Sequence, residues 1–426
     1  MTGRLARTAG RCLAAVSVAA MVAAAPAGAW AQASSGLRPA NLRPTSESAE
    51  GGLWLMAEKA EVHVKGAAEL NKEAALNAYV EQVVCKLAAD YCEELRVYVL
   101  DRPLINASAA PNGYFEIHSG LLLRARTEDE LAFVLGHEIT HFARNHSLAE
   151  WERTKRTANG IMVLQLAVAA GGAAAAYGAA ANGASYGTID AISSAAQSVS
   201  DLVYLAGIAS LYGYSREQET ESDRLGFERA VWAGYSKDAG VGMWSEALAE
   251  ALASDFPKVR ENEVRASIFK THPITPARID ALIGMGGTRT EPDLAAQKTY
   301  RAVIRPHLGA WLKDDLRRRD AGQSLYLIDR LSKLGEDMGV LLFYRGEALR
   351  QRRGPDDGPA ALAAYKAAAA YPDAPAATWR ELGEAQRKQG DRAAAADAFR
   401  TYLTRAPEAE DRWLVEATLK SLEAST

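Results

Sequence analysis

The chain has 426 residues, of which 48% are hydrophobic and 24% are charged, and its formal net charge is −4. This length allows two domains with sizeable cores, and the composition is that of an ordinary globular protein. The small net charge gives no support to nucleic-acid binding or to a strongly charged substrate, and no RNA- or DNA-binding motif is present.

The first 31 residues have the pattern of a secretory signal peptide. Three arginines within residues 4–11 precede an apolar, alanine-rich run over residues 12–25, and small residues stand before a cleavage site after Ala31. The chain is therefore expected to be exported to a bacterial periplasm. Residues 32–50 are rich in Ser, Pro and Ala and are predicted to be disordered.

Residues 51–90 are predicted to be helical, and the alternation in "LRVYVLD" (95–101) predicts a strand. Cys85 and Cys92 are the cysteines that remain once the signal peptide is removed. In an oxidising compartment such a pair predicts a disulfide, which would join the end of the helix around 73–88 to that strand. Two small buried thiols are the alternative.

The stretch "PNGYFEIHSGLLLR" (111–124) predicts a turn at Asn112 and Gly113, followed by a strand through Ile117. His118, at the end of this strand, is expected to face outward rather than to bind a metal.

The stretch "LAFVLGHEITHFARNHS" (131–147) contains a metal-binding pattern on a predicted helix, with Thr127 as its N-cap. His137 and His141 are four residues apart, so both imidazoles project from one face and can reach one zinc ion. Glu138 would lie beside the metal, where it can act as a general base. A chance match on an amphipathic helix is the alternative.

A catalytic zinc site needs three protein ligands, and the extended H-E-x-x-H-x-x-G-x-x-H motif is one source of the third. This chain fails that test, because Arg144 and Ser147 stand where Gly and His are required. His146 is one residue out of register and is expected on the outer face of the helix.

A glutamate from a second helix is the other source of a third ligand. In "YSREQETESDRLG" (214–226), Glu219 and Asp223 are four residues apart and share one face. Glu219 could ligate zinc while Asp223 orients a ligating histidine, whereas Glu217 and Glu221 point elsewhere. A solvated acidic helix is the alternative.

Residues 157–189 contain no charged side chain and are rich in Ala and Gly. The stretch is long enough to span a bilayer, but Ala and Gly drive insertion poorly. The segment 157–215 is therefore predicted to be a helical hairpin or lid between the two metal-binding helices, in contact with a membrane surface or an unfolded protein. A closely packed helix pair and a membrane-spanning pair are the alternatives.

Residues 286–298 are predicted to be a linker, and the chain is predicted to be helical from residue 299 to its end. Seven residues fall at tetratricopeptide spacings: Trp379, Leu382, Gly383, Ala395, Phe399, Tyr402 and Pro407. Such helix pairs stack into a concave surface that binds peptides or partner proteins. A helical bundle without a binding role is the alternative.

The motifs "HEITH", "SREQETESDRLG" and "THPITPARID" together resemble the zinc metallopeptidases of the CAAX prenyl protease type. Within these, the chain is most similar to the periplasmic beta-barrel assembly-enhancing proteases, which carry C-terminal tetratricopeptide repeats. The resemblance implies an α+β fold: a mainly helical gluzincin-type metallopeptidase domain (51–285) with a small sheet, followed by an all-α tetratricopeptide-like repeat domain (299–426).

Carried onto this sequence, the resemblance makes His137, His141 and Glu219 the zinc ligands and Glu138 the catalytic glutamate. Asp223 matches the aspartate that ends the family's E-x-E-A-D pattern. A serine replaces the alanine of that pattern, at a position off the ligand face.

His272 lies in "THPITPARID", where Pro273 and Pro276 stiffen the turn that presents it. It is a candidate regulatory fourth zinc ligand, which would close the site until a protein substrate displaces it. A substrate-side histidine that assists catalysis is the alternative.

The predicted function is that of a periplasmic zinc endopeptidase with one Zn²⁺ per chain. The resemblance implies unfolded or misassembled outer-membrane proteins as substrates and the outer-membrane assembly machinery as a partner of the repeats. It also implies that the strand within 111–124 borders the cleft and pairs with an extended substrate. The rival prediction is a chaperone or assembly factor that binds such proteins with little proteolysis.

Overall fold

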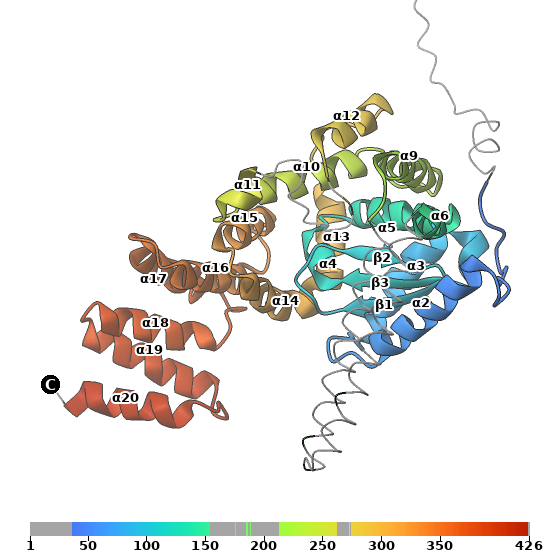
Figure 1. Ribbon diagram of the computed structural model, residues 1–426. Coiled ribbons are helices and arrows are strands. Elements are labelled where there is room, and N and C mark those ends of the chain that lie inside the picture. Colours follow the sequence, from blue (N-terminus) through green and yellow to red (C-terminus); the bar gives the residue numbers. More distant parts are fainter. Residues whose placement is uncertain are drawn as a thin grey trace, which may run out of the picture. The chain divides into compact units, whose positions relative to one another are not determined.

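The computed structural model describes residues 36–153, 213–261, 272 and 274–424, together with the single residues 175, 185 and 188. The elements below belong to the compact unit Arg38–Thr426 (Figure 1). The predicted signal peptide and most of the predicted lid over 157–215 lie outside the described residues. No helix of the described ranges has the length and apolar character needed to cross a membrane.

Up to Arg153 the elements are α2 (Ala49–Lys65), α3 (Ala74–Leu87), η1 (Ala89–Tyr91), β1 (Arg96–Leu100), β2 (Ala107–Ala109), β3 (Tyr114–His118), α4 (Ser119–Arg124), α5 (Glu128–Ala143) and α6 (His146–Arg153). From Arg216 onward they are α9 (Arg216–Trp232), α10 (Ala239–Leu252), α11 (Pro257–Glu261), α12 (Pro276–Gly284), α13 (Leu294–Ile304), η2 (Arg305–His307), α14 (Leu308–Asp315), η3 (Leu316–Arg318), α15 (Ala321–Ser332), α16 (Met338–Arg352), α17 (Asp357–Ala368), α18 (Ala377–Lys388), α19 (Arg392–Arg405) and α20 (Arg412–Ala424). This order confirms the predicted α+β region followed by an all-α region.

The three strands form one sheet in the order β1–β3–β2, with β1 parallel and β2 antiparallel to β3. The prediction that the strand within 111–124 offers its edge to a substrate is wrong, because β3 is the central strand and both of its sides are paired. Within the described ranges, the free edge beside α5 belongs to β2. The sequence of β2, "ASA", has none of the branched or aromatic residues that signal a strand.

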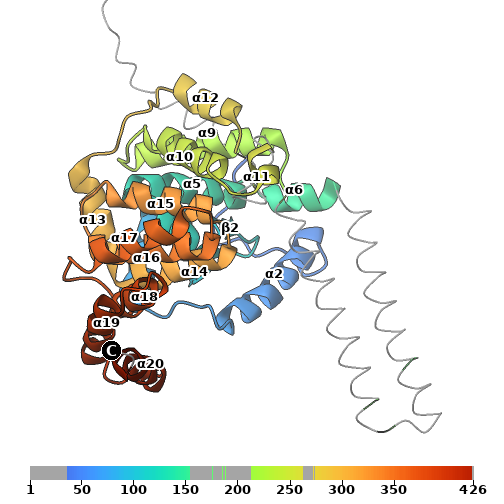
Figure 2. The same ribbon diagram turned by 90° about the vertical axis from the view of Figure 1, so that its left-hand side faces the viewer.

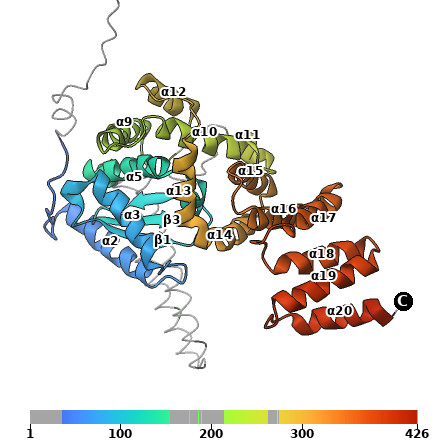
Figure 3. The same ribbon diagram turned by 180° about the vertical axis from the view of Figure 1, so that it is seen from behind.

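The helix that carries the metal-binding pattern, α5, is enclosed on every side. Each residue from Glu130 to Ala143 is buried, because α5 contacts β2, α3, α9 and α10. Figure 2 shows α9 and α10 on one side of α5, and Figure 3 shows α3 over the sheet from behind. The predicted N-cap is confirmed: Oγ1 of Thr127 accepts a hydrogen bond from the amide of Glu130 (3.3 Å).

Two segments are more ordered than their composition predicts. Arg38 lies within the predicted disordered stretch, yet it is buried; its guanidinium packs on the ring of Phe142 (4.4 Å) and donates to the carbonyl oxygen of Pro111 (2.9 Å). Helix α13 begins at Leu294, inside the predicted linker. The preceding residues are also held, since Glu291 pairs with Arg126 at 2.9 Å.

Cys85 and Cys92 form a disulfide bond, as predicted, which joins the end of α3 to the turn before β1. In the C-terminal region, α16 packs on α17 and α18 packs on α19. In the second pair the Phe399 ring lies against Gly383, where an added Cβ would come within 2.7 Å of the ring. Helix pairs are thus present, and their assignment as tetratricopeptide repeats stays a prediction.

Candidate metal centre

Three ionisable side chains of α5 lie in one enclosed space. His137, Glu138 and His141 are each 1% exposed. The Nε2 atoms of His137 and His141 are 3.0 Å apart, as their spacing of one helical turn predicts.

Helix α9 reaches this space because it crosses α5 at two glycines. A Cβ on Gly136 would lie 3.0 Å from the carbonyl oxygen of Gly226, and a Cβ on Gly226 would lie 2.7 Å from the amide nitrogen of His137. The close approach brings Glu219 to the histidines: its Oε2 lies 3.6 Å from Nε2 of His137 and its Oε1 lies 3.6 Å from Nε2 of His141.

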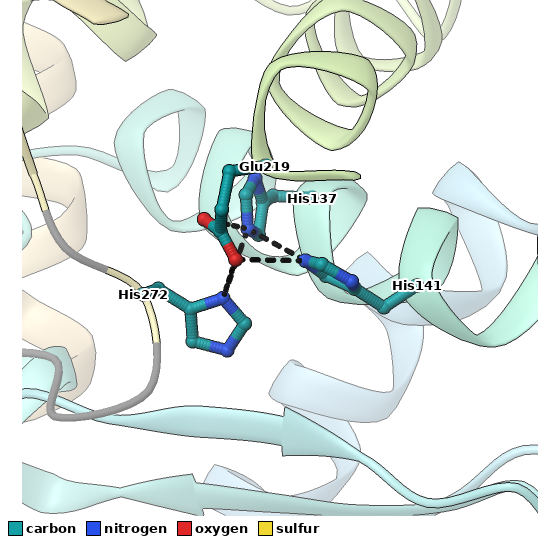
Figure 4. Close-up of side chains that lie close together, drawn as sticks. All are labelled: His137, His141, Glu219 and His272. Atoms are coloured by element: carbon teal, nitrogen blue, oxygen red, sulfur yellow. Dashed lines mark hydrogen bonds and ion pairs between the residues drawn. The ribbon is translucent and has the colours of Figure 1, made fainter. Parts of the chain in front are cut away.

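His272 supplies a fourth donor from a different part of the chain (Figure 4). Its Nδ1 lies 2.8 Å from Oε1 of Glu219 and 3.4 Å from Nε2 of His137. Its Nε2 lies 3.5 Å from Oε1 of Glu138, and the ring is fully enclosed.

The four side chains lie close enough together to hold one metal ion. At a zinc bond length of about 2.0–2.1 Å, tetrahedral ligand atoms are roughly 3.3 Å apart. The distances given above, which involve one or the other oxygen of Glu219, run from 2.8 to 3.6 Å, and one atom from each of the four residues lies within 4.8 Å of the others. Imidazole nitrogens with a carboxylate oxygen are also the donor set that zinc prefers.

Asp223 orients the side chain of His137. Its Oδ1 lies 3.0 Å from Nδ1 of His137. Because a carboxylate only accepts hydrogen bonds, Nδ1 of His137 carries the proton. Nε2 of His137 is then free to bind a metal. Trp244 and Arg278 also donate to Asp223. Burial alone would raise the pKa of Asp223, but the charges and hydrogen bonds of Arg278 and His137 together outweigh burial and lower the pKa, so the side chain stays a carboxylate.

Arg278 is a residue of the site that the sequence analysis missed. Beside its two hydrogen bonds to Asp223, its Nη1 lies 2.8 Å from Oε2 of Glu219. Thr275 caps α12 and Pro276 begins it, which fixes where Arg278 points. The helix cap and the proline could be recognised in "THPITPARID", but the partners of Arg278 could not, because they lie on α9. Asp223, for example, is 55 residues away in the sequence.

The expectation for His146 is wrong. It is 4% exposed rather than on the outer face of α5, and its Nδ1 lies 2.9 Å from Nδ1 of His141. The helix ends at Ala143, and Asn145 adopts a left-handed conformation (φ 53°) that turns the chain back. Asparagine is a known stop signal after a helix. The prediction extended the helix past Asn145, and this placed His146 wrongly on its outer face.

His118 is also buried (5% exposed) rather than outward-facing, because β3 is the central strand and is covered on both faces. It lies outside the group of four donors.

The two glutamates at the centre differ in their electrostatics. Burial raises the pKa of Glu138, although His272 and His137 act in the opposite direction. Burial would also raise the pKa of Glu219, but the charge and hydrogen bond of His272 and the charges of His137 and Arg278 together outweigh burial and lower that pKa. Glu219 is therefore suited to remain an anion, while the raised pKa of Glu138 favours the uptake of a proton.

Comparison with known proteins agrees with this geometry. The model of Peptidase family M48 matches residues 70–285. A Vibrio cholerae protein provisionally named a beta-barrel assembly-enhancing protease is 30% identical over 213 residues, which are 48% of this chain and 38% of the relative. The beta-barrel assembly-enhancing protease of Escherichia coli K12 is 24% identical over 227 residues, 51% of this chain and 40% of the relative. Human mitochondrial metalloendopeptidase OMA1 is 39% identical over 51 residues, 12% of this chain and 10% of the relative.

This chain thus spans about two fifths of the length of the two bacterial relatives. The family match covers half of the 426 residues and includes all four donors and Glu138. The chain therefore belongs to peptidase family M48.

Proposed function

We propose that this chain is a zinc-dependent endopeptidase of the bacterial periplasm that hydrolyses misfolded or misassembled envelope proteins. The observation that supports the catalytic part is the convergence of His137, His141 and Glu219 on one enclosed point beside Glu138. A site with three protein ligands and an adjacent carboxylate is the arrangement of hydrolytic zinc enzymes.

The chemistry divides between the metal and the chain. Zinc, when bound, supplies a Lewis acid that polarises the scissile carbonyl group and increases the acidity of water. Glu138 accepts the proton of the attacking water and delivers it to the nitrogen of the leaving amine. The raised pKa of Glu138 favours this uptake, since a base works best when its pKa approaches the ambient pH.

The free edge of β2 is where we place the substrate. An extended, unfolded segment can add to such an edge as a further strand through main-chain hydrogen bonds, with little dependence on its sequence. Because β2 contacts α5, a segment bound there would pass close to the side chains of that helix. A folded protein has few free extended segments, so this mode of binding favours unfolded substrates.

The substrate class and compartment have separate support. The predicted signal peptide and the disulfide indicate an exported protein. The bacterial relatives are named for enhancing beta-barrel assembly, which suggests outer-membrane beta-barrel proteins as substrates and their assembly machinery as a partner. The C-terminal helix pairs would provide the surface for these proteins.

The test is the substitution Glu138→Gln in the zinc-loaded chain. It removes the base but no ligand, so we expect full zinc content, an unchanged thermal unfolding curve and a loss of casein hydrolysis of about 100-fold or more. Wild-type activity should also disappear with a chelator and return with zinc. A variant that keeps more than about a tenth of the wild-type rate would contradict the role of Glu138, and a wild-type chain that binds clients without cleaving them would favour the chaperone function.

A further inference from the structure

His141 is supported from behind by a second imidazole rather than by a carboxylate. Its Nε2 faces the donor cluster, and its Nδ1 lies 2.9 Å from Nδ1 of His146. The other nitrogen of His146, Nε2, lies 3.1 Å from Oε2 of Glu221 on α9. The ring of Tyr214 stacks on His141 at 3.8 Å and 19°, which fixes the plane of the ligand.

The direction of the hydrogen bonds that connect His141, His146 and Glu221 follows from Glu221. The Glu221 carboxylate can only accept, so Nε2 of His146 carries the proton and Nδ1 of His146 is left with a lone pair. Nδ1 of His141 lies closer to that lone pair, at 2.9 Å, than the Ser222 hydroxyl does, at 3.4 Å, so the lone pair accepts from Nδ1 of His141 and the ring proton of His141 lies there. Nε2 of His141 then has no proton and can bind a metal. The reverse direction would put the proton of His141 on Nε2 and block ligation.

We propose that Glu221 acts through His146 to hold His141 in the tautomer that binds zinc, so that both are positioning residues of the metal centre. This inference rests on the proposed zinc site. His137 receives the same support directly from Asp223, whereas His141 receives it across one additional imidazole. Partners of this kind commonly change metal affinity by about 10- to 100-fold when they are removed.

Arg144 makes a conservative substitution at Glu221 informative. Its Nε lies 2.9 Å from Oε1 of Glu221 and its Nη2 contacts the same oxygen, which leaves Oε2 for His146. In Glu221→Gln the carbonyl oxygen stays with Arg144, so the amide NH₂ faces Nε2 of His146. That group donates, which reverses the hydrogen bonds that connect residue 221, His146 and His141 (the relay). The reversal places a proton on Nε2 of His141.

The experiment measures zinc affinity of the full chain by competition with a chromophoric chelator, in a double-mutant cycle. Glu221→Gln should weaken zinc binding by about tenfold or more. In a His146→Asn background the amide oxygen can accept from His141 whatever residue stands at 221, so Glu221→Gln should there change affinity by less than about twofold. The visible spectrum of the Co²⁺-loaded chain reports ligand geometry independently of activity, and Glu221→Gln should change it in the wild-type background only.

The control is Glu228→Gln, a carboxylate on the same helix that pairs with Arg224 but with no histidine among the described contacts. Its zinc affinity should equal that of the wild type. Equal losses from Glu221→Gln in both backgrounds would show an effect of charge alone and overturn the relay. An unchanged zinc affinity of Glu221→Gln in the wild-type background would also overturn the relay. A wild-type chain that binds no zinc would overturn the proposed metal centre itself.

Discussion

His272 lies between Glu219 and Glu138, 2.8 Å from Oε1 of Glu219 and 3.5 Å from Oε1 of Glu138. A fourth protein ligand fills the position that catalytic zinc sites keep open for water. We therefore predict that His272→Ala raises the basal rate of casein hydrolysis while the zinc content stays unchanged. The rate should increase by a factor equal to the inverse of the fraction of wild-type molecules in which His272 does not bind zinc.

The matched control is His63→Ala, which removes an exposed histidine whose ring contacts only the Lys59 carbonyl oxygen among the described contacts. Its rate should stay at the wild-type value. If His272→Ala leaves the rate equal or lower while zinc is retained, the residue is not an inhibitory ligand. Its proximity to Glu138 would then indicate a role in assisting the reaction.

At this scale, sequence spacing predicted the residues that share a helical turn. His137 and His141 meet as their i, i+4 spacing requires, and the same spacing brings Asp223 to the site together with Glu219. Arg278 could not be placed in this way, because it reaches the site from a third helix. The roles of these residues stay predictions until they are substituted.

Among the elements, the crossing of α5 and α9 determines whether Glu219 reaches His137 and His141. A Cβ at Gly226 would lie 2.7 Å from the backbone nitrogen of His137, so the helices must separate to accept it. We predict that Gly226→Ala lowers the free energy of unfolding by about 1–3 kcal/mol, as overpacking does. It should also weaken zinc binding, because Glu219 moves with α9.

Both quantities can be measured on the same samples, by denaturant unfolding and by chelator competition. Gly52→Ala is the control, since an added Cβ at this helical position meets nothing within 4 Å. It should be neutral or stabilising by up to about 1 kcal/mol. A Gly226→Ala variant with wild-type stability and zinc affinity would show that the close crossing is not needed.

The long, periodic elements could be predicted from the sequence and the short ones could not. The helix around His137 follows from its cap and its apolar spacing, and it lies where expected. The three residues of β2 carry no strand signal, so β3 was taken for an edge strand. Sheet order depends on pairing between segments, which no local pattern reports.

In the molecule as a whole, a buried ion cluster joins three helices. Arg124 of α4 contacts Glu250 of α10 and Asp315 of α14, both at 2.6 Å, and all three side chains are 1% exposed. Burial alone would raise the pKa of Asp315, but the charges of Arg124 and Arg318 and a hydrogen bond from Ser324 lower it to about 2.

This shift predicts how stability depends on pH. The pKa of Asp315 is lower in the folded than in the unfolded chain, so its contribution is present above the unfolded value of about 3.9 and is lost as pH falls toward 2. Asp315→Asn should therefore lower the free energy of unfolding more at pH 7 than near pH 2, by about 2 kcal/mol. Denaturant unfolding at both pH values measures this, and a difference independent of pH would contradict it.

The same cluster crosses the domain boundary that the sequence predicts at residue 299. Beside Asp315, Tyr300 of α13 donates to the carbonyl oxygen of Leu122 (2.8 Å), and Trp311 of α14 donates to Asp101 (2.8 Å). These helices therefore pack against the region that the family model matches. The composition of 286–298 indicates a linker, but no local pattern reveals the packing of the helices that follow it.

The boundary can be tested by two truncations of the chain. Ending it at residue 298 removes Asp315 and leaves Arg124 without one of its two buried partners, a loss that costs about 3–5 kcal/mol in comparable cases, so we expect no stable fold. Ending it at Asp337 keeps α13–α15 and the carboxylates that pair with Arg305, and should preserve zinc binding and the hydrolysis of short peptides. Only the selection of large unfolded substrates should suffer, because α16–α20 are absent. A stable, zinc-binding chain that ends at 298 would show that the metallopeptidase ends where the sequence predicts.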